Sequence, residues 1–240
     1  MTTFFCILFI VALLYASVGH GGASGYLALM AVYNFTPDVM KPTALMLNLF
    51  VSLTSFLLYY KGGHFKWKVF LPFALASIPF SFLGGTISLD VQLYKKILGV
   101  LLLFPVMRFF VLPNTDDKDL KPTKLFISLL FGAIIGFLSG LIGIGGGILL
   151  SPILLLFNWT NQKQTAAISA LFIFVNSIAG LAGQLSHGIQ IDPSMLSFVA
   201  IAFSGGLVGA WLGAIKFNPQ ILKYTLAVVL LMASVKLILT

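Results

Sequence analysis

Ten apolar segments follow one another along the chain, and no acidic residue lies near the centre of any of them. Such a chain cannot cover the surface of a soluble domain, because soluble proteins carry charge on about a quarter of their residues and this chain carries it on 8%. The segments also lack the alternating polarity of membrane β-strands. We therefore predict an all-α polytopic membrane protein, with segments at about 3–18, 23–35, 43–60, 69–88, 95–112, 125–142, 147–159, 166–186, 194–215 and 221–239.

The order of segment lengths, which is long, short, long, long, long, occurs twice. At an offset of 124 residues, Gly-His-Gly-Gly-Ala at 19–23 aligns with Gly-Ile-Gly-Gly-Gly at 143–147. The same offset aligns Tyr-Asn-Phe-Thr at 33–36 with Phe-Asn-Trp-Thr at 157–160. Two matches at one offset indicate a duplicated unit, which is common in transporters.

The short segment of each unit, at 23–35 and at 147–159, cannot cross a membrane as a helix. Its 13 residues rise about 20 Å, whereas a bilayer core is about 30 Å thick. A glycine run precedes each short segment, so we predict that each forms a re-entrant hairpin with the segment before it, with the tip at membrane depth. One broken helix that crosses once is the alternative. A Gly-rich hairpin plus three transmembrane helices makes the two repeats inverted, whereas four crossings make them parallel.

The basic residues favour the inverted repeats. With hairpins, ten of the 14 Lys and Arg residues fall on one side of the membrane, whereas single crossings divide them eight to six. Because Lys and Arg are enriched in cytoplasmic connections, both termini are expected outside the cell membrane. The expected organisation is repeat 1 at 1–112, a polar cytoplasmic linker at 113–124 and repeat 2 at 125–240. The basic residues assigned to the outer side are Lys41, Lys95, Lys96 and Lys236.

The distribution of charged residues excludes several classes of function. The chain has no carboxylate inside a segment for an ion relay, and it has no phosphate-binding Gly-Lys-Ser/Thr loop, no Cys and His cluster for a metal and no convergent catalytic set. We therefore predict no enzyme activity, no cofactor and no metal site. The basic residues form no single patch, so the expected partners are the lipid bilayer and a small anion, and not nucleic acid.

Uncharged polar residues cluster where the two short helices begin. A helix that starts at membrane depth has unpaired N–H groups and a partial positive charge in its first turn, and glycine lets an anion approach these groups. Two such tips that face each other would form an anion site at the midplane. The alternative is that the glycines only permit a tight turn. The predicted substrate-binding residues here are Gly19, His20, Gly21, Gly22 and Ser24 in the first tip and Gly143, Gly145, Gly146 and Gly147 in the second.

Three polar residues on the crossings after the tips complete the predicted site: Asn48, Ser169 and Asn176. Ser169 and Asn176 are seven residues apart and share one helix face. Hydrogen bonds to neighbouring helices are the alternative role for all three. His20 is the one ionisable residue in either tip, and it is expected either to donate to the anion, with or without carrying a proton, or to cap a backbone carbonyl.

Small residues recur four apart in two segments, at Gly132, Gly136 and Gly140 and at Gly205, Gly209 and Gly213. This spacing lets helix backbones approach closely. We predict that these glycines pack helices together within one subunit, and they leave a homo-oligomer open.

These residues give the chain a resemblance to the sulfite exporter TauE/SafE family of membrane proteins. The resemblance covers essentially the whole chain and rests on the sequences at 19–22 and 140–147, on the Ser-Pro pair at 151–152 and on the duplicated layout. It implies transport of sulfite or small organosulfonates, commonly export. His20 and Ala23 depart from the glycine-rich pattern of the second tip.

The expected function is secondary transport of a small oxyanion, sulfite or an organosulfonate, by alternating access of two inverted halves around a midplane site. An anion channel is one alternative, because the same dipoles can line a pore. A membrane subunit that binds a partner protein and transports nothing is the other.

Overall fold

The structure is a computed structural model that describes residues 2–17, 22–111, 120–189, 193–213 and 219–239. Within these ranges the chain is helical, with ten helices and no strand. The predicted all-α fold is thus confirmed, and each helix occupies one of the predicted apolar segments. The helices are α1 (Thr2–Ser17), α2 (Ala23–Val32), α3 (Pro37–Lys61), α4 (Trp67–Gly85), α5 (Val91–Val111), α6 (Leu125–Ile142), α7 (Gly147–Leu156), α8 (Gln162–Ser186), α9 (Pro193–Gly213) and α10 (Pro219–Leu239).

Helix length separates the elements into two kinds. On their described residues, α3, α4, α6 and α8 are long and apolar enough to cross a bilayer. Helices α2 and α7 have 10 residues each, so each rises only about 15 Å. Nearly all of α2 is buried, as is most of α7, because a helix that is apolar on all sides is stable only when other elements surround it.

Two helices begin earlier than the apolar pattern indicated. Helix α3 starts at Pro37 and not at 43, and α8 starts at Gln162 and not at 166. Their first turns are polar, so hydropathy alone does not include them. Pro37 occupies the first helical turn, where proline is favoured, and Asn161 forms a capping box with Gln164.

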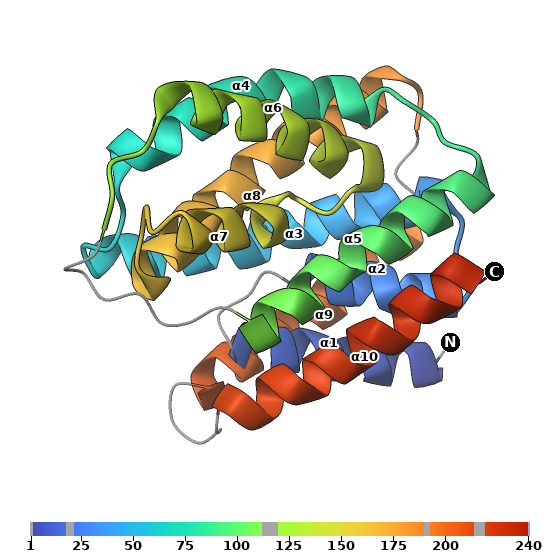
Figure 1. Cartoon of the computed structure of the whole chain (residues 1–240). Coiled ribbons are helices and arrows are strands. Elements are labelled where there is room, and N and C mark those ends of the chain that lie inside the picture. Colours follow the sequence, from blue (N-terminus) through green and yellow to red (C-terminus); the bar gives the residue numbers. More distant parts are fainter. Residues whose placement is uncertain (1, 18–21, 112–119, 190–192, 214–218, 240) are drawn as a thin grey trace.

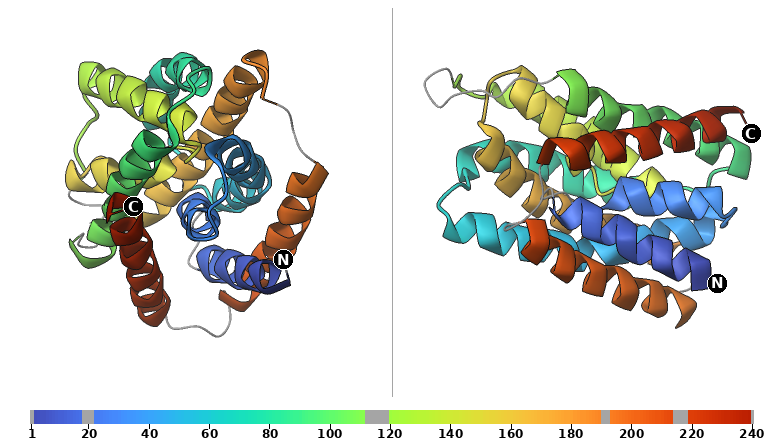
Figure 2. Two further views of the ribbon diagram at one scale, coloured as in Figure 1. Left: turned by 90° about the vertical axis from the view of Figure 1, so that its right-hand side faces the viewer. Right: turned by 90° about the horizontal axis from the view of Figure 1, so that it is seen from below.

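Four of the closely packed helix pairs are α4 with α6, α1 with α9, α3 with α8, and α5 with α10 (Figures 1 and 2). Exchanging the first five helices with the last five converts the α4–α6 pair into the α9–α1 pair and leaves the other two pairs unchanged. These four pairs therefore repeat in both halves of the chain, whereas the close contact of α4 with α8 corresponds to a much less extensive contact of α9 with α3.

Glycine contacts give the direction of these pairs. A Cβ added to Gly132 would meet the backbone of Phe73, and one added to Gly136 would meet that of Ser77, so α4 and α6 run in the same direction. Helices α5 and α10 run in opposite directions (Figure 1), and they are joined where Ser234 of α10 donates to the carbonyl of Gly99 in α5 at 2.7 Å. Close packing of small residues within the subunit is thereby confirmed for α6.

One turn has the same conformation in both halves. Asn34 follows α2 and Asn158 follows α7, and both have a positive φ, of 59° and 53°. The backbone N–H of each asparagine donates to the carbonyl three residues earlier, at 3.1 and 3.0 Å. Asparagine tolerates the left-handed region better than most residues, which explains why it occupies the turn that follows each short helix.

The path of the chain places both described ends on the same side of the molecule, which we call the terminal side (Figure 1). Helix α5 ends on the other side, which we call the linker side, and α6 begins there. Helix α3 runs from the terminal side to the linker side and α8 runs back. The two short helices start in the interior and run toward opposite sides, α2 toward the terminal side and α7 toward the linker side.

Candidate functional site

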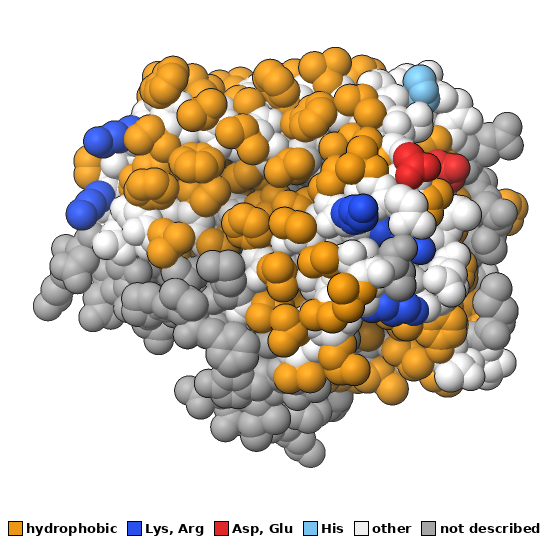
Figure 3. Space-filling model, turned by 45° about the vertical axis from the view of Figure 1, so that its right-hand side comes forward, with side chains coloured by type: hydrophobic (Ala, Val, Ile, Leu, Met, Phe, Trp, Pro, Cys, Tyr) orange, Lys and Arg blue, Asp and Glu red, His pale blue; other side chains and the backbone are white. Residues whose placement is uncertain are grey.

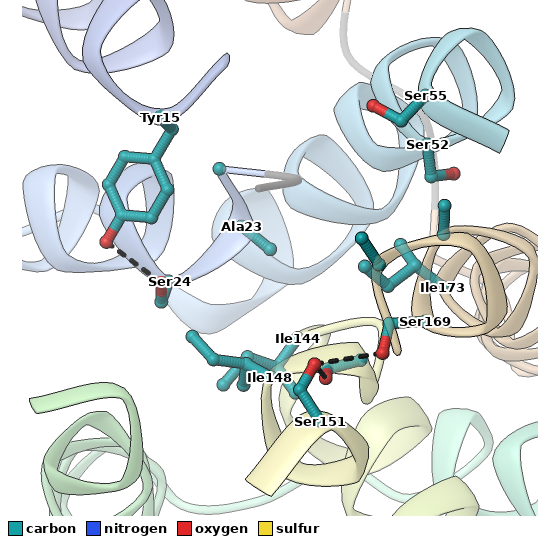
Figure 4. A pocket seen from close by; sticks show the side chains of 14 residues that line it. Tyr15, Ala23, Ser24, Ser52, Ser55, Ile144, Ile148, Ser151, Ser169 and Ile173 are labelled. Carbon is teal, nitrogen blue, oxygen red and sulfur yellow. Dashed lines mark hydrogen bonds between the residues drawn. The ribbon is translucent and has the colours of Figure 1, made fainter. Parts of the chain in front are cut away.

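A cavity of about 50 Å³ lies where the first turns of α2 and α7 meet α3 and α8 (Figure 4). The end of α1 closes it on one side through Tyr15. No charged side chain is among the described residues that line it. These residues are Tyr15, Gly22, Ala23, Ser24, Ser52, Ser55, Ile144, Gly147, Ile148, Ser151, Ala166, Ser169, Ala170 and Ile173.

Both short helices present their N-termini to this cavity. In α2 the first backbone hydrogen bond runs from Tyr26 to Gly22 at 2.9 Å, so the N–H groups of Ala23 and Ser24 have no acceptor within the helix. In α7 the bonds begin with Leu149 and Leu150, which both donate to Gly146 at 3.0 Å. Neither N-cap supplies a side-chain hydrogen bond. The first turns therefore direct partial positive charge into the cavity.

Hydroxyl groups from five helices complete the cavity wall (Figure 4). Tyr15 Oη and Ser24 Oγ are 3.0 Å apart, and Ser151 Oγ and Ser169 Oγ are 2.9 Å apart. Ser52 and Ser55 contribute two more hydroxyls from α3. A hydroxyl can donate and accept, so this wall can bind a small polar solute through neutral groups together with the backbone N–H groups.

The second tip contains three glycines with left-handed backbone conformations. Gly143 ends α6 with φ 86°, and Gly145 and Gly146 have φ 78° and 76°. Residues with a side chain rarely adopt this backbone region, which explains why glycine occupies these three positions of the tip. Residues from 143 to 146 are buried, and the chain turns here from the end of α6 to the start of α7.

The structure brings together part of the predicted site. Gly22, Ser24, Gly147 and Ser169 all line the cavity. Gly19, His20 and Gly21 lie outside the described residues. Gly143, Gly145 and Gly146 form the second tip but are absent from the cavity wall, because the chain turns behind it.

The two predicted asparagines do not line the cavity either. Both are fully buried and lie farther along α3 and α8 toward the terminal side. Asn176 Nδ2 donates to the carbonyl of Phe172 at 2.8 Å, one turn earlier in α8. Asn48 contacts Gly145 of the second tip, and neither atom of its amide has a hydrogen-bond partner in the described part of the chain.

Several cavity residues were not in the predicted set: Tyr15, Ser52, Ser55 and Ser151. Ser151 lies four residues after Gly147 and its hydroxyl donates to the Gly147 carbonyl at 2.7 Å, so its position one turn into α7 is a signal that the sequence offered. Ser52 and Ser55 share a face with Asn48. Tyr15 carried no such signal, because it ends an apolar run.

The position of Lys41 in the structure contradicts its interpretation as a topology signal. The sequence places it between apolar runs as a topology signal, but it lies inside α3 and is 1% exposed. Its Nζ donates to the carbonyl of Ile87 at 3.1 Å and lies 5.7 Å from the centre of the Tyr94 ring. Tyr94 in turn donates to the carbonyl of Ile142 at 2.9 Å, next to the second tip.

The surface agrees with a lipid environment. Figure 3 shows a broad apolar band on one face, with the charged side chains gathered toward its ends. Exposed Leu, Ile, Phe and Val residues occur along α4, α6 and α10. Among the described residues no group of three His, Cys, Asp or Glu side chains lies close enough to hold a metal ion.

Comparison with known proteins gives a consistent set of relatives. The family model described as "Sulfite exporter TauE/SafE" matches residues 4–237. A probable membrane transporter protein of Sinorhizobium fredii is 38% identical over 238 residues, which cover 96% of this chain and 95% of that protein. A probable membrane transporter protein of Methanocaldococcus jannaschii is 29% identical, over 89% of this chain and 84% of its own length.

A plant protein named as a member of the sulfite exporter TauE/SafE family, from Arabidopsis thaliana, is 35% identical over 102 residues, or 40% of this chain and 22% of its own length. No solved structure gives a significant match to the chain.

Proposed function

The chain belongs to the sulfite exporter TauE/SafE family of membrane transporters, and from this premise we propose that it is a secondary transporter of a small oxyanion, sulfite or an organosulfonate. It is a multi-pass membrane protein, and its relatives are transporters and not enzymes. The cavity between the two short helices is the proposed substrate site, with Gly22, Ser24, Gly147 and Ser169 among the residues that bind the anion.

One observation carries the proposal, namely that the first turns of two oppositely directed helices meet at one cavity lined by hydroxyls. Each helix N-terminus contributes about half a positive charge and free N–H donors, which is a common way to bind anionic groups. No carboxylate or ammonium is among the described lining residues. A cation would meet the positive ends of two helices here, whereas an anion is stabilised by both.

The size of the cavity favours a small substrate. Its volume of about 50 Å³ is a few times the roughly 10–15 Å³ that one water molecule requires on the same measure. An anion with three or four oxygens is compatible with this space, whereas a large organic anion requires the walls to move apart. Sulfite and the sulfonate group share the trigonal arrangement of oxygens that neutral donors on several sides can bind.

Alternating access of two inverted halves is the proposed mechanism, and the packing supports it. A twofold axis in the membrane plane makes each helix antiparallel to its own counterpart. Helix α5 runs opposite to α10, and α3 runs opposite to α8 (Figure 1). Both described ends lie on the terminal side, as expected if repeat 1 at 1–112 and repeat 2 at 125–240 each contain a hairpin and three crossings.

The distribution of basic residues supports the orientation proposed for the cell membrane. Lys41 is buried and is therefore a poor topology signal. Without it, the division predicted from the sequence becomes ten basic residues on the side of the 113–124 linker against three on the other side. By the positive-inside rule we assign the linker side to the cytoplasm and both termini to the outside.

Flux into proteoliposomes tests the function. Purified protein is reconstituted, and uptake of radiolabelled sulfite is followed with sulfate, methanesulfonate and 2-hydroxyethanesulfonate as competitors and protein-free liposomes as control. We expect saturable sulfite uptake that at least one sulfonate inhibits. Absence of both flux and binding for all of these anions would refute the proposal. Single-channel currents in planar bilayers would favour the channel, and copurification with a stoichiometric partner without flux would favour the assembly subunit.

A further inference from the structure

Buried polar atoms without hydrogen-bond partners are concentrated beyond the cavity, toward the terminal side. They belong to residues that are 0% exposed, on α3, α6 and α8. Leaving such groups unpaired is costly to a folded protein, so a cluster of them requires an explanation other than stability. The unpaired atoms of the described residues are Thr43 Oγ1, both amide atoms of Asn48, Ser139 Oγ, Asn176 Oδ1, Ser177 Oγ and both amide atoms of Gln184.

The unpaired side chains on α3 and α8 lie along the line where these two helices are in contact. Asn48 and Ser177 meet at Gly145, where an added Cβ would touch both side chains. Three residues farther from the cavity on each helix, Leu45 lies against Gly180. The two helices are thus antiparallel, and the same register continued by one turn brings Lys41 level with Gln184.

The cavity occupies the other half of the same helix pair. Its α3 residues are Ser52 and Ser55, and its α8 residues run from Ala166 to Ile173. The unpaired polar groups begin where the cavity ends and continue for about 10 Å along α8, since Gln184 lies seven residues after Ser177 and each step rises about 1.5 Å. We call this continuation, from Asn48 and Ser177 to Lys41 and Gln184, the α3–α8 seam.

Lys41 gives the seam a charge at its far end. Its ammonium is enclosed in the protein, and its partners in the described part of the chain are a carbonyl oxygen and an aromatic ring. Neither of these carries a charge, and the carboxylate that interacts electrostatically with the ammonium is that of Asp38, three residues earlier in α3. A buried cation inside a membrane protein is expensive and usually marks a pathway for ions. The unpaired amide N–H groups of Asn48 and Gln184 and the unpaired hydroxyls are donors that lie between the cavity and this buried cation. Such a series of donors suits an anion.

Helix α4 packs closely against the part of α8 that forms the seam. A Cβ added to Gly183 would overlap the carbonyl of Phe82, and one added to Gly85 would overlap that of Gly180. The hydroxyl of Ser81 donates to the carbonyl of Asn176 at 2.8 Å. Helix α9, which corresponds to α4 in the second half, packs much less extensively against α3 than α4 does against α8. The pair is therefore closed on the terminal side, and the cavity lies on the linker side.

We propose that the α3–α8 seam is the closed half of the anion pathway, that it opens when α4 moves away from α8, and that Lys41 binds the anion at its outer end. This inference rests on the proposed function for the identity of the cargo. The unpaired amides and hydroxyls are then the groups that water and the anion contact once the seam is open. In the same step α9 packs against α3 and closes the access to the cavity from the linker side.

Cysteine accessibility tests the opening without any assumption about the substrate. In a Cys6→Ser background, Ser177→Cys and Ser55→Cys are compared for reaction with a membrane-impermeant methanethiosulfonate. We expect Ser55→Cys to react and Ser177→Cys to be protected. Adding Gly183→Ala, whose Cβ displaces α4 from α8, should raise the reaction rate of Ser177→Cys at least fivefold and lower that of Ser55→Cys. Misfolding would raise both rates, so opposite changes identify the pathway.

Sulfite flux tests the role of Lys41. Lys41→Met should reduce flux at least tenfold, and Lys41→Arg should retain a larger part of it because the charge remains. Lys163→Met is the matched control, since Lys163 holds the corresponding place at the start of α8 and is exposed; its flux should equal that of the wild type. Equal thermal stability of the three variants in detergent excludes a purely structural effect.

Two results would overturn the inference. One is a Ser177→Cys rate that Gly183→Ala leaves unchanged while the protein remains monodisperse. The other is normal flux for Lys41→Met. A wild-type protein that moves none of the tested anions, yet shows the opposite changes in cysteine reactivity, would refute the proposed substrate and retain the seam as a gated pathway.

Discussion

At the scale of single residues, the hydrogen bond between Ser151 and Ser169 has a defined direction. Each hydroxyl has one hydrogen, and Ser151 uses its own to donate to the Gly147 carbonyl at 2.7 Å. In the bond of 2.9 Å between the two serines, Ser169 is therefore the donor. Rotation of this one hydroxyl is enough to direct its hydrogen from Ser151 to a bound anion.

Removal of that donor is expected to weaken anion binding. A hydrogen bond to a charged group contributes about 1.5–3 kcal/mol, so Ser169→Ala should raise the apparent Kd for sulfite by about 10-fold to 100-fold, given tenfold per 1.4 kcal/mol. Titration of purified protein in detergent by isothermal calorimetry measures the change. Ser204→Ala is the control, because Ser204 is exposed and donates only to its own helix; equal effects of the two substitutions would contradict the assignment.

At the scale of helices, the α4–α6 contact shows how glycine determines packing. Gly132, Gly136 and Gly140 lie on one face of α6 and bring its backbone against Phe73, Ser77 and Ser81 of α4. In a lipid environment helix association depends on such close contact, since no hydrophobic effect drives one helix onto another. Helix α9 repeats the arrangement against α1, where Gly205 lies on the backbone of Phe9.

A single added methyl group should disturb this contact. In Gly136→Ala the new Cβ would lie 2.5 Å from Cα of Ser77, which backbone atoms cannot relieve by a rotamer change. Overpacking of this kind typically costs about 1–3 kcal/mol, so the midpoint of thermal unfolding in detergent should fall. Ala182→Leu adds more volume on an exposed face of α8 and should leave the midpoint nearly unchanged. Similar losses for both variants would mean that α6 does not depend on this contact.

At the scale of the whole molecule, the arrangement of helices decides what the short ones can do. Helix α2 starts in the interior and runs toward the terminal side, and α7 runs toward the linker side. Their N-termini meet because each half of the chain contributes one short helix and the halves are oppositely directed. A single half has one such terminus and only part of the hydroxyl wall, so the cavity requires both halves.

The inverted arrangement predicts opposite exposure of corresponding connections. Asp38, at the start of α3, and Lys163, at the start of α8, are both exposed, whereas Lys41 is too buried for labelling. In a Cys6→Ser background, Asp38→Cys should react with an impermeant maleimide added to intact cells, and Lys163→Cys should react only after permeabilisation. Reaction of both positions from the same side would contradict the inverted repeats.

Much of the fold was predictable because hydropathy and length are local properties. Every predicted apolar segment contains a helix, and the glycine runs mark the ends of α1 and α6 and the starts of α2 and α7. The first turns of α3 and α8 were missed because polar capping residues carry no hydropathy signal. Within the site, Ser24 and Ser169 were identified from their place near the tips, whereas Tyr15 was not, because its partner Ser24 is brought close by the fold.

The sequence by itself determined that the chain is a helical membrane protein with a duplicated order of segments, because apolar length and repeated spacing do not depend on how the helices pack. Only the tertiary structure decided which polar residues meet. It brings Gly22 and Gly147 to one cavity, separates Asn48 and Asn176 from it, and encloses Lys41 within α3. The physical reason is that burial and pairing depend on which helices become neighbours, and contacts such as that between Gly145 and Asn48 join segments nearly a hundred residues apart.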